Sequence, residues 1–254
     1  MNYILKSIPS RTAKPRSSGF TMAMDKGLSL REVEDFVETC GDFIDIVKLG
    51  WATSYVTKNL KEKIEIYRSA GIPVYFGGTL FEAFVIRDQF EDYLQLLDRY
   101  QLSFAEVSDG SITLEHDKKC NYIEVLSKEV TVLSEVGSKD AAKIIPPYKW
   151  IEQMQKELNA GAWKVIGEAR EGGTVGLFRD SGEVRQGLVE EILTQIPEEK
   201  IIWEAPQKEQ QVWFIKLLGT NVNLGNIAPN DFIPLETLRL GLRGDTFDYF
   251  LNQF

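Results

Sequence analysis

Short apolar runs alternate with amphipathic segments of helical period along the whole chain, and this alternation restricts the fold more than any other feature. Eight of the runs predict strands, at 20–25, 45–50, 73–78, 103–110, 129–137, 162–170, 200–206 and 221–229. Strands that alternate with helices pair in parallel through right-handed crossovers. Eight repeats in 254 residues therefore predict one (β/α)8 barrel of the TIM type, a single domain over 1–254 with residues 1–18 as an N-terminal extension.

Composition excludes several classes of function. The net charge of −9 argues against nucleic acid as a partner, because phosphate binding needs clustered Lys and Arg. Two cysteines, Cys40 and Cys120, are too few for a disulfide framework or a thiolate metal site. His116 is the only histidine, and this argues against imidazole metal sites and Ser-His-Asp chemistry. It lies in a polar stretch, where we expect it to be solvated. Without a signal-peptide core or an apolar stretch long enough to span a membrane, we expect a soluble cytoplasmic protein with no membrane partner.

The predicted strands end in polar residues, and in such barrels the active site lies at this carboxyl-terminal end of the strands. These residues are Asp25, Lys48, Gly77, Gly78, Glu106, Asp109, Glu135, Glu168, Arg170, Glu204, Asn223 and Asn226. Alternation of side chains along a strand places Glu204 on the same face as Ile202, with Trp203 toward the helices. The same rule pairs Lys48 with Ile46, Glu135 with Leu133, and Glu168 with Ile166. Carboxylates from the fourth to the seventh strand should therefore meet at one mouth.

Converging carboxylates without histidine predict a cation among them. Several acids at one mouth repel one another and raise their pKa values unless positive charge lies between them. Oxygen-only ligands suit Mg²⁺. The simpler alternative for Glu204, which ends the buried stretch "KIIWEAP", is a salt bridge to a neighbouring helix.

Cations and backbone groups at the same rim predict a small, multiply charged acid as the ligand. Lys48, Lys139 and Arg170 can bind phosphate or carboxylate. The Gly77–Gly78 pair before a helix offers backbone N–H groups to an anion, although a tight strand-to-helix turn also explains these glycines. The stretch "NLGNIAPND" after the eighth strand lies where phosphate sites of such barrels commonly form.

Eight strings follow one another in order between about residues 14 and 247. They are KPRSSGFTMAMDKGL, VKLGWATS, GGTLFE, EVSDGS, SEVGSKD, EAPQKEQQ, VNLGNI and LETLRLGLRGDTF. In these strings the chain resembles the phosphosulfolactate synthase family, with Gly172 standing where the family pattern has serine. The resemblance implies a lyase that adds sulfite to phosphoenolpyruvate with Mg²⁺, through a metal-stabilised aci-carboxylate and without a Schiff base, giving (2R)-phospho-3-sulfolactate. It also implies a homo-oligomer, and a product that feeds coenzyme M synthesis or accumulates as sulfolactate.

Within that chemistry the polar strand ends receive expected roles. Lys139 is the first candidate for the general acid that protonates C2, and Lys48 is the second. Arg170 and the remaining lysine are expected to hold phosphate and sulfite. Further expected substrate contacts are Gly77, Gly78, Asn223 and Asn226. The expected metal ligands are Glu106, Asp109, Glu135, Glu168 and Glu204.

Two alternatives stay open at the level of sequence. Lys164 on the sixth strand allows a Schiff-base aldolase, although strand geometry places it about 13 Å below Glu168, at the opposite end of the strand. The second alternative is a non-catalytic protein similar to the plant heat-stress-associated proteins of the same family. The acids and cations at the strand ends argue against it.

Overall fold

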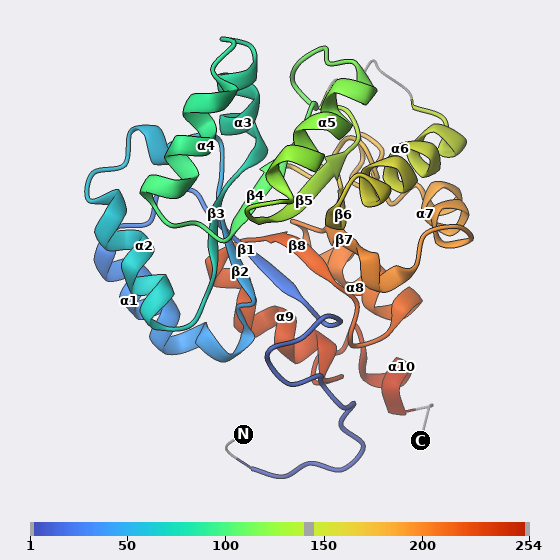
Figure 1. The fold of residues 1–254 in the computed structure, drawn as a ribbon. Helices are drawn as coiled ribbons and strands as arrows, with labels where there is room; N and C mark the ends of the chain where they lie inside the picture. Colours follow the sequence, from blue (N-terminus) through green and yellow to red (C-terminus); the bar gives the residue numbers. More distant parts are fainter. Residues whose placement is uncertain (1–2, 140–144, 252–254) are drawn as a thin grey trace.

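The structure, a computed structural model, describes residues 3–139 and 145–251. Its strands form one sheet that curls into a barrel with helices around it (Figure 1). The strands are β1 (Thr21–Asp25), β2 (Ile46–Leu49), β3 (Val74–Phe76), β4 (Phe104–Val107), β5 (Thr131–Val136), β6 (Ala162–Gly167), β7 (Ile201–Glu204) and β8 (Leu224–Ile227). The α-helices are α1 (Leu30–Cys40), α2 (Leu60–Ser69), α3 (Gly78–Val85), α4 (Phe90–Arg99), α5 (His116–Leu126), α6 (Pro147–Asn159), α7 (Gln186–Leu193), α8 (Lys208–Leu218), α9 (Phe232–Arg239) and α10 (Phe247–Leu251).

Every strand falls inside a run that the sequence predicts to be a strand, and the predicted (β/α)8 barrel is confirmed. The strand order is β3-β2-β1-β8-β7-β6-β5-β4, and all the neighbouring pairs are parallel. Closure is nearly complete. β3 and β4 lie side by side, but the structure shows no backbone ladder between them within its described residues. The Gly78 N–H bridges this seam by donating to Glu106 Oε1 at 2.6 Å.

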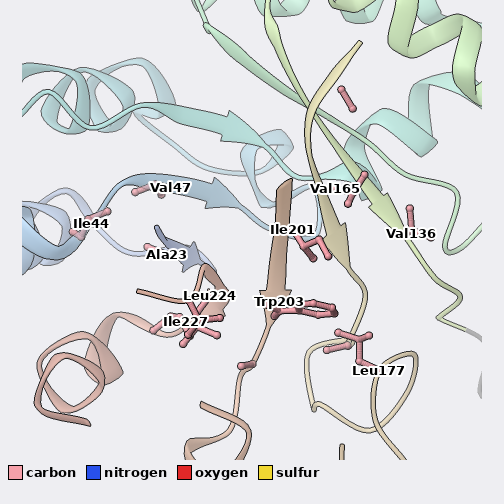
Figure 2. Packing of buried hydrophobic residues seen from close by; sticks show 14 of the residues in the cluster. Ala23, Ile44, Val47, Val136, Val165, Leu177, Ile201, Trp203, Leu224 and Ile227 are labelled. Carbon is pink, nitrogen blue, oxygen red and sulfur yellow. The ribbon is translucent and has the colours of Figure 1, made fainter. Parts of the chain in front are cut away.

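Side chains alternate between the barrel interior and the layer beneath the helices, as the sequence predicts. The interior cluster consists of Phe20, Met22, Ile46, Tyr75, Leu133, Ile166 and Ile202. Trp203 instead belongs to the outer cluster of buried residues (Figure 2). It stacks on Phe214 of α8, with ring centroids 5.2 Å apart. Such a pair contributes about 0.5–1.5 kcal/mol beyond the area it buries. Because the interior is filled with apolar side chains, polar chemistry is confined to the two barrel ends.

The N-terminal segment packs under the amino ends of the strands. Arg16 Nε lies 2.9 Å from Asp45 Oδ1, and both side chains are buried. Lys164 Nζ donates to the Ser17 carbonyl at 2.9 Å and to the carbonyl of Glu199, which precedes β7. Lys164 therefore lies at the amino end of the barrel, as strand geometry predicts. Among the described residues, no helix has the length and apolar character needed to cross a membrane.

Candidate active site

A pocket of about 290 Å³ opens at the carboxyl ends of the strands. Its walls come from several strand ends and from the loops that follow them. They are formed by Met24, Lys48, Trp51, Thr79, Ser111, Glu135, Lys139, Glu168, Arg170, Glu171, Glu204 and Asn226. The sequence analysis named seven of these residues as polar strand ends or as cations at the rim: Lys48, Glu135, Lys139, Glu168, Arg170, Glu204 and Asn226.

Three buried carboxylates form the floor of the pocket. Glu135 is the last residue but one of β5, Glu168 follows β6 and Glu204 ends β7, so neighbouring strands carry them at a similar level. One carboxylate oxygen from each lies within 4.8 Å of the other two. The three residues are only 1–2% exposed. The convergence predicted from side-chain alternation is thus present for these three acids.

Lys48 supplies the central positive charge. Its Nζ lies 2.9 Å from Glu106 Oε1, 3.1 Å from Glu135 Oε2 and 3.5 Å from Glu204 Oε1. Burial by itself lowers the pKa of Lys48, but the three carboxylates outweigh it and raise this pKa well above its usual range. Lys48 is therefore a permanent cation, held in place from three sides.

Lys139 forms part of the wall and is the more accessible of the two lysines. Its Nζ lies 3.0 Å from Glu135 Oε1 and 3.5 Å from Glu168 Oε2. Its side chain is 23% exposed, against 7% for Lys48. Burial lowers the pKa of Lys139, while Glu135 and Glu168 raise it, and the net effect is a rise above the usual range. The ammonium group is thus charged and faces the pocket.

The three floor carboxylates do not share the negative charge equally. Burial and the charges of Glu135 and Glu204 raise the pKa of Glu168 well above its usual range. Burial also raises the pKa of Glu204 to about 7, against the opposing effect of Lys48. For Glu135, burial is outweighed by Lys139 and Lys48, so its pKa falls well below normal. The pKa values of Glu168 and Glu204 are thus raised, while that of Glu135 is lowered.

The floor residues fit a hard metal ion. Glu135 Oε1 and Glu168 Oε2 are buried, and the Lys139 ammonium lies 3.0 Å from the first and 3.5 Å from the second. Carboxylates buried this close together repel one another, and a cation among them relieves that repulsion. A donor set of three carboxylates without sulfur or imidazole suits a hard cation.

Two predicted metal ligands lie apart from this group. Glu106 sits behind Lys48 with no exposed surface, and it accepts the Gly78 N–H across the β3–β4 seam. Asp109 is paired with Lys119 of α5, whose Nζ lies 2.9 Å from Asp109 Oδ1. Neither residue lines the pocket. Each already has a cationic partner within the chain.

Arg170 and Asn226 stand at the rim of the pocket in a constrained arrangement. Both have left-handed backbone, with φ of 59° and 57°. For a residue with a side chain this costs about 1–2 kcal/mol, although Asn adopts it more readily. The Arg170 N–H donates to Glu168 Oε1, and Asn226 Nδ2 donates to the Arg170 carbonyl at 3.1 Å. Within the described residues no hydrogen bond or ion pair engages the Arg170 side chain, so its guanidinium is available to a ligand.

The backbone N–H groups of the Gly77–Gly78 pair are bonded within the chain. The Gly77 N–H donates to the Leu49 carbonyl at 3.0 Å, and the Gly78 N–H is taken by Glu106. Glycine is needed at 78 because a Cβ there would lie 2.2 Å from Ser108 Oγ, at the close approach of β3 to β4. The tight-turn interpretation of these glycines fits the structure better.

Asn223 lies at the opposite end of the barrel from the pocket. β8 begins only at Leu224, so Asn223 precedes the strand. Its Oδ1 accepts the Phe20 N–H at 3.0 Å, and its Nδ2 donates to the Ile201 carbonyl at 3.0 Å. The structure thus places Asn223 away from the pocket, because β8 begins three residues later than the predicted strand.

A buried network behind the pocket was missed in the sequence. Lys119 of α5 is 1% exposed, and its Nζ donates to the Glu135 carbonyl at 2.6 Å and lies 2.9 Å from Glu157 Oε1. His116 Nε2 lies 3.0 Å from the same Glu157 oxygen. We expected this histidine to be solvated, and the structure instead gives it a carboxylate partner. The spacing of His116 and Lys119 places them on one helix face, which was the available signal.

The mouth of the pocket carries a second group that the sequence did not single out. Lys26 Nζ lies 4.7 Å from the ring centre of Trp51 and 3.1 Å from Glu171 Oε1. Trp51 and Glu171 both line the pocket. Asp25, by contrast, is turned away from the mouth and paired with buried Lys63 at 3.1 Å.

Comparison with known proteins gives a consistent result. A family model described as (2R)-phospho-3-sulfolactate synthase matches residues 9–245. Phosphosulfolactate synthase of Bacillus subtilis (strain 168) is 43% identical over 250 residues, which cover 97% of this chain and 99% of that protein. Phosphosulfolactate synthase of Methanothermobacter thermautotrophicus is 41% identical over 244 residues, covering 94% and 95%.

A solved structure similar to this one is 3-hexulose-6-phosphate synthase from Salmonella typhimurium, with a TM-score of 0.57 and 15% identity. The match covers 92% of this chain and 100% of that one. At this level of identity the likeness concerns the barrel fold alone.

Proposed function

The chain belongs to the phosphosulfolactate synthase family, and we propose that it adds sulfite to phosphoenolpyruvate with Mg²⁺, giving (2R)-phospho-3-sulfolactate. The observation that carries the proposal is the pocket itself. Three buried carboxylates, the charged Lys139 and Arg170 line one cavity at the carboxyl ends of the strands. That combination suits an anionic substrate that gains negative charge during the reaction.

Glu135, Glu168 and Glu204 are the residues proposed to hold the metal. Bound there, Mg²⁺ supplies positive charge to the carboxylate of phosphoenolpyruvate, where negative charge develops. Lys48 keeps Glu135 and Glu204 in place through its ion pairs. We leave Glu106 and Asp109 out of the proposed ligand set because neither lines the pocket or belongs to the group of three converging carboxylates.

The reaction forms one C–S bond and one C–H bond. The sulfur lone pair of sulfite attacks C3, and the C2–C3 π electrons move toward C2 and the carboxylate. A proton is then delivered to C2 from one face, and Lys139 is proposed to donate it because its ammonium group faces the pocket. Arg170 is proposed to hold the phosphate or sulfite at the rim, with Asn226 fixing its backbone.

Turnover in the presence and absence of metal tests the proposal. Purified protein with phosphoenolpyruvate, sulfite and Mg²⁺ should form a sulfur-containing phosphate ester, detectable by phosphorus NMR and mass spectrometry. Excess chelator should reduce turnover roughly a hundredfold or more, because such an ion contributes several kcal/mol to the barrier, and added Mg²⁺ or Mn²⁺ should restore it. Turnover that persists in chelator would exclude the metal. No product with any divalent cation would favour the non-catalytic alternative.

A Schiff-base aldolase is a poorer fit to the structure. Burial lowers the pKa of Lys164 to about 8, as Schiff-base chemistry requires, but this lysine lies at the amino end of the barrel. We expect activity to survive borohydride treatment in the presence of phosphoenolpyruvate. Mass spectrometry of the treated protein should show no substrate adduct on any lysine. An adduct with loss of activity would revive the aldolase alternative.

Cytoplasmic location and a homo-oligomeric state remain predictions, and gel filtration with light scattering measures the second. The fate of the product in coenzyme M synthesis or as sulfolactate likewise remains a proposal that rests on the family.

A further inference from the structure

We propose that Gln210 is a positioning residue that holds the loop segment 170–176 against the barrel and thereby sets Arg170 at the rim of the pocket. Gln210 itself does not line the pocket. The inference rests on the proposed function in one respect, that Arg170 binds the anionic substrate.

The segment leaves the barrel and returns to almost the same point. Its first end is Glu168, and its second is Leu177, whose N–H donates to the Glu168 carbonyl at 3.0 Å. Leu177 has no exposed surface and packs in the core near Trp203 (Figure 2). Both ends are therefore fixed, and the position of Arg170 depends on what holds the turn between them.

Side-chain amides from the start of α8 hold that turn. Gln210, 1% exposed, donates through Nε2 to the Gly173 carbonyl at 2.8 Å and to the Gly182 carbonyl at 3.1 Å. Its Oε1 accepts the Gln207 N–H at 3.1 Å. Gln207 Nε2 in turn donates to the Gly172 carbonyl at 2.6 Å. Both N–H groups of the buried Gln210 amide thus donate to loop carbonyls, while its Oε1 accepts the N–H of the residue that caps α8.

The loop backbone packs directly on this amide. Gly173 has a φ of 65°, and a Cβ at this position would lie 2.4 Å from Gln210 Nε2. A side chain at 173 would therefore displace either the loop or the amide. Glycine and glutamine at these two positions are matched to one another.

The position of Arg170 depends on the contacts of Gln210 and Gln207 with the loop, because the other hydrogen bonds that hold Arg170 are made by its own backbone. Its φ of 59° is kept by hydrogen bonds at both its N–H and its carbonyl. Strained backbone of this kind persists only where the surroundings fix it. If the turn at 172–173 is released, the Arg170 backbone should lose its fixed conformation, while Glu135 and Glu204, which lie on strands, keep their positions.

Kinetics of Gln210→Leu and Arg170→Ala, alone and combined, test the inference. We expect Gln210→Leu to raise the KM for phosphoenolpyruvate roughly tenfold, with kcat and the Mg²⁺ requirement little changed. In the double variant the KM should match that of Arg170→Ala, because both changes remove the same contact. KM increases that multiply in the double variant would overturn the inference. Gly173→Ala disturbs the same contact from the loop side and should give the same pattern if Gln210→Leu fails to fold.

Hydrogen exchange without substrate separates this inference from the proposed function. Amides of 170–176 should exchange faster in Gln210→Leu than in the wild type, while those of β5 and β7 stay protected. Gln211→Leu is the matched control, since Gln211 is also buried on α8 but donates to the Ala205 carbonyl instead of the loop. Loop exchange should be unchanged in the control. Unchanged loop exchange in Gln210→Leu refutes the positioning role, whereas an inactive wild type refutes only the proposed reaction.

Discussion

Lys139→Ala should lower kcat by roughly a hundredfold to ten-thousandfold while changing the KM for phosphoenolpyruvate much less. A general acid acts in the transition state, and proton transfer by a positioned side chain contributes a factor of this size. Glu135 retains Lys48 as a partner in this variant, so the melting temperature should fall little. Steady-state kinetics and a thermal melt of the same preparation measure both quantities.

Arg170→Ala is the contrasting variant. A charge-assisted hydrogen bond to an anion contributes about 1.5–3 kcal/mol, so the KM should rise roughly ten- to a hundredfold while kcat changes less. The reverse pattern in the two variants would exchange the roles of Lys139 and Arg170. Near-wild-type kinetics in both would remove these residues from the mechanism.

The high pKa of Lys139 bears on its role as an acid. Glu135 and Glu168 hold the proton on Lys139 in the structure as it stands. A metal cation among the same carboxylates would compete for their charge and weaken that hold. Lys48 has three carboxylate partners and little exposed surface, so it is less able to move toward a substrate. For this reason we propose Lys139, and not Lys48, as the proton donor.

The alternation of apolar runs with amphipathic helical segments predicted the barrel. Strands buried on both faces read as continuous apolar runs, and few folds other than a barrel contain eight of them in alternation with helices. The alternation did not predict the seam between β3 and β4, because the Gly78 N–H there meets a carboxylate from β4 instead of a strand partner. That contact depends on which side chain the neighbouring strand presents. The same contact engages the Gly78 N–H, which we expected to face an anion.

The convergence of Glu135, Glu168 and Glu204 could be predicted because side chains alternate along a strand. An apolar interior residue two positions earlier therefore shows that the glutamate side chain also points into the barrel. Asn223 was misplaced because the strand boundary, which alternation does not fix, decides which barrel end it occupies. Lys119 was missed because an inward-facing lysine on a helix has the same local sequence as a solvated one. Its partners come from β5 and α6, which local sequence around α5 does not reveal.

Glu204→Gln should shift the Mg²⁺ requirement to at least about tenfold higher concentration, with partial rescue at high Mg²⁺ and little change in melting temperature. The substitution keeps an acceptor for the Ala169 N–H, now 3.1 Å from Glu204 Oε2, but removes a ligand charge. Even the loss of residues that only support metal ligands commonly costs ten- to a hundredfold in metal affinity. Activity as a function of Mg²⁺ concentration measures the shift.

Stability should survive this substitution for two reasons. Lys48 still has Glu106 and Glu135 within 3.1 Å, so no buried cation is left alone. Burial also raises the pKa of Glu204 to about 7, so this group favours the folded state at acid pH and that contribution is lost as the pH rises through 7. At pH 8, in the absence of metal, the charged Glu204 is thus a cost that glutamine removes.

Asp25→Asn is the matched control for a purely structural carboxylate. Asp25 ends β1, is 1% exposed and pairs with buried Lys63 at 3.1 Å outside the pocket. Its neutralisation leaves that lysine without a counter-charge and should cost about 3–5 kcal/mol of stability with an unaltered Mg²⁺ requirement. If Glu204→Gln behaves like Asp25→Asn, with a large fall in melting temperature and no metal shift, then Glu204 is a salt-bridge residue. The predicted contrast follows from position, because Glu204 shares its site with two further carboxylates and Asp25 does not.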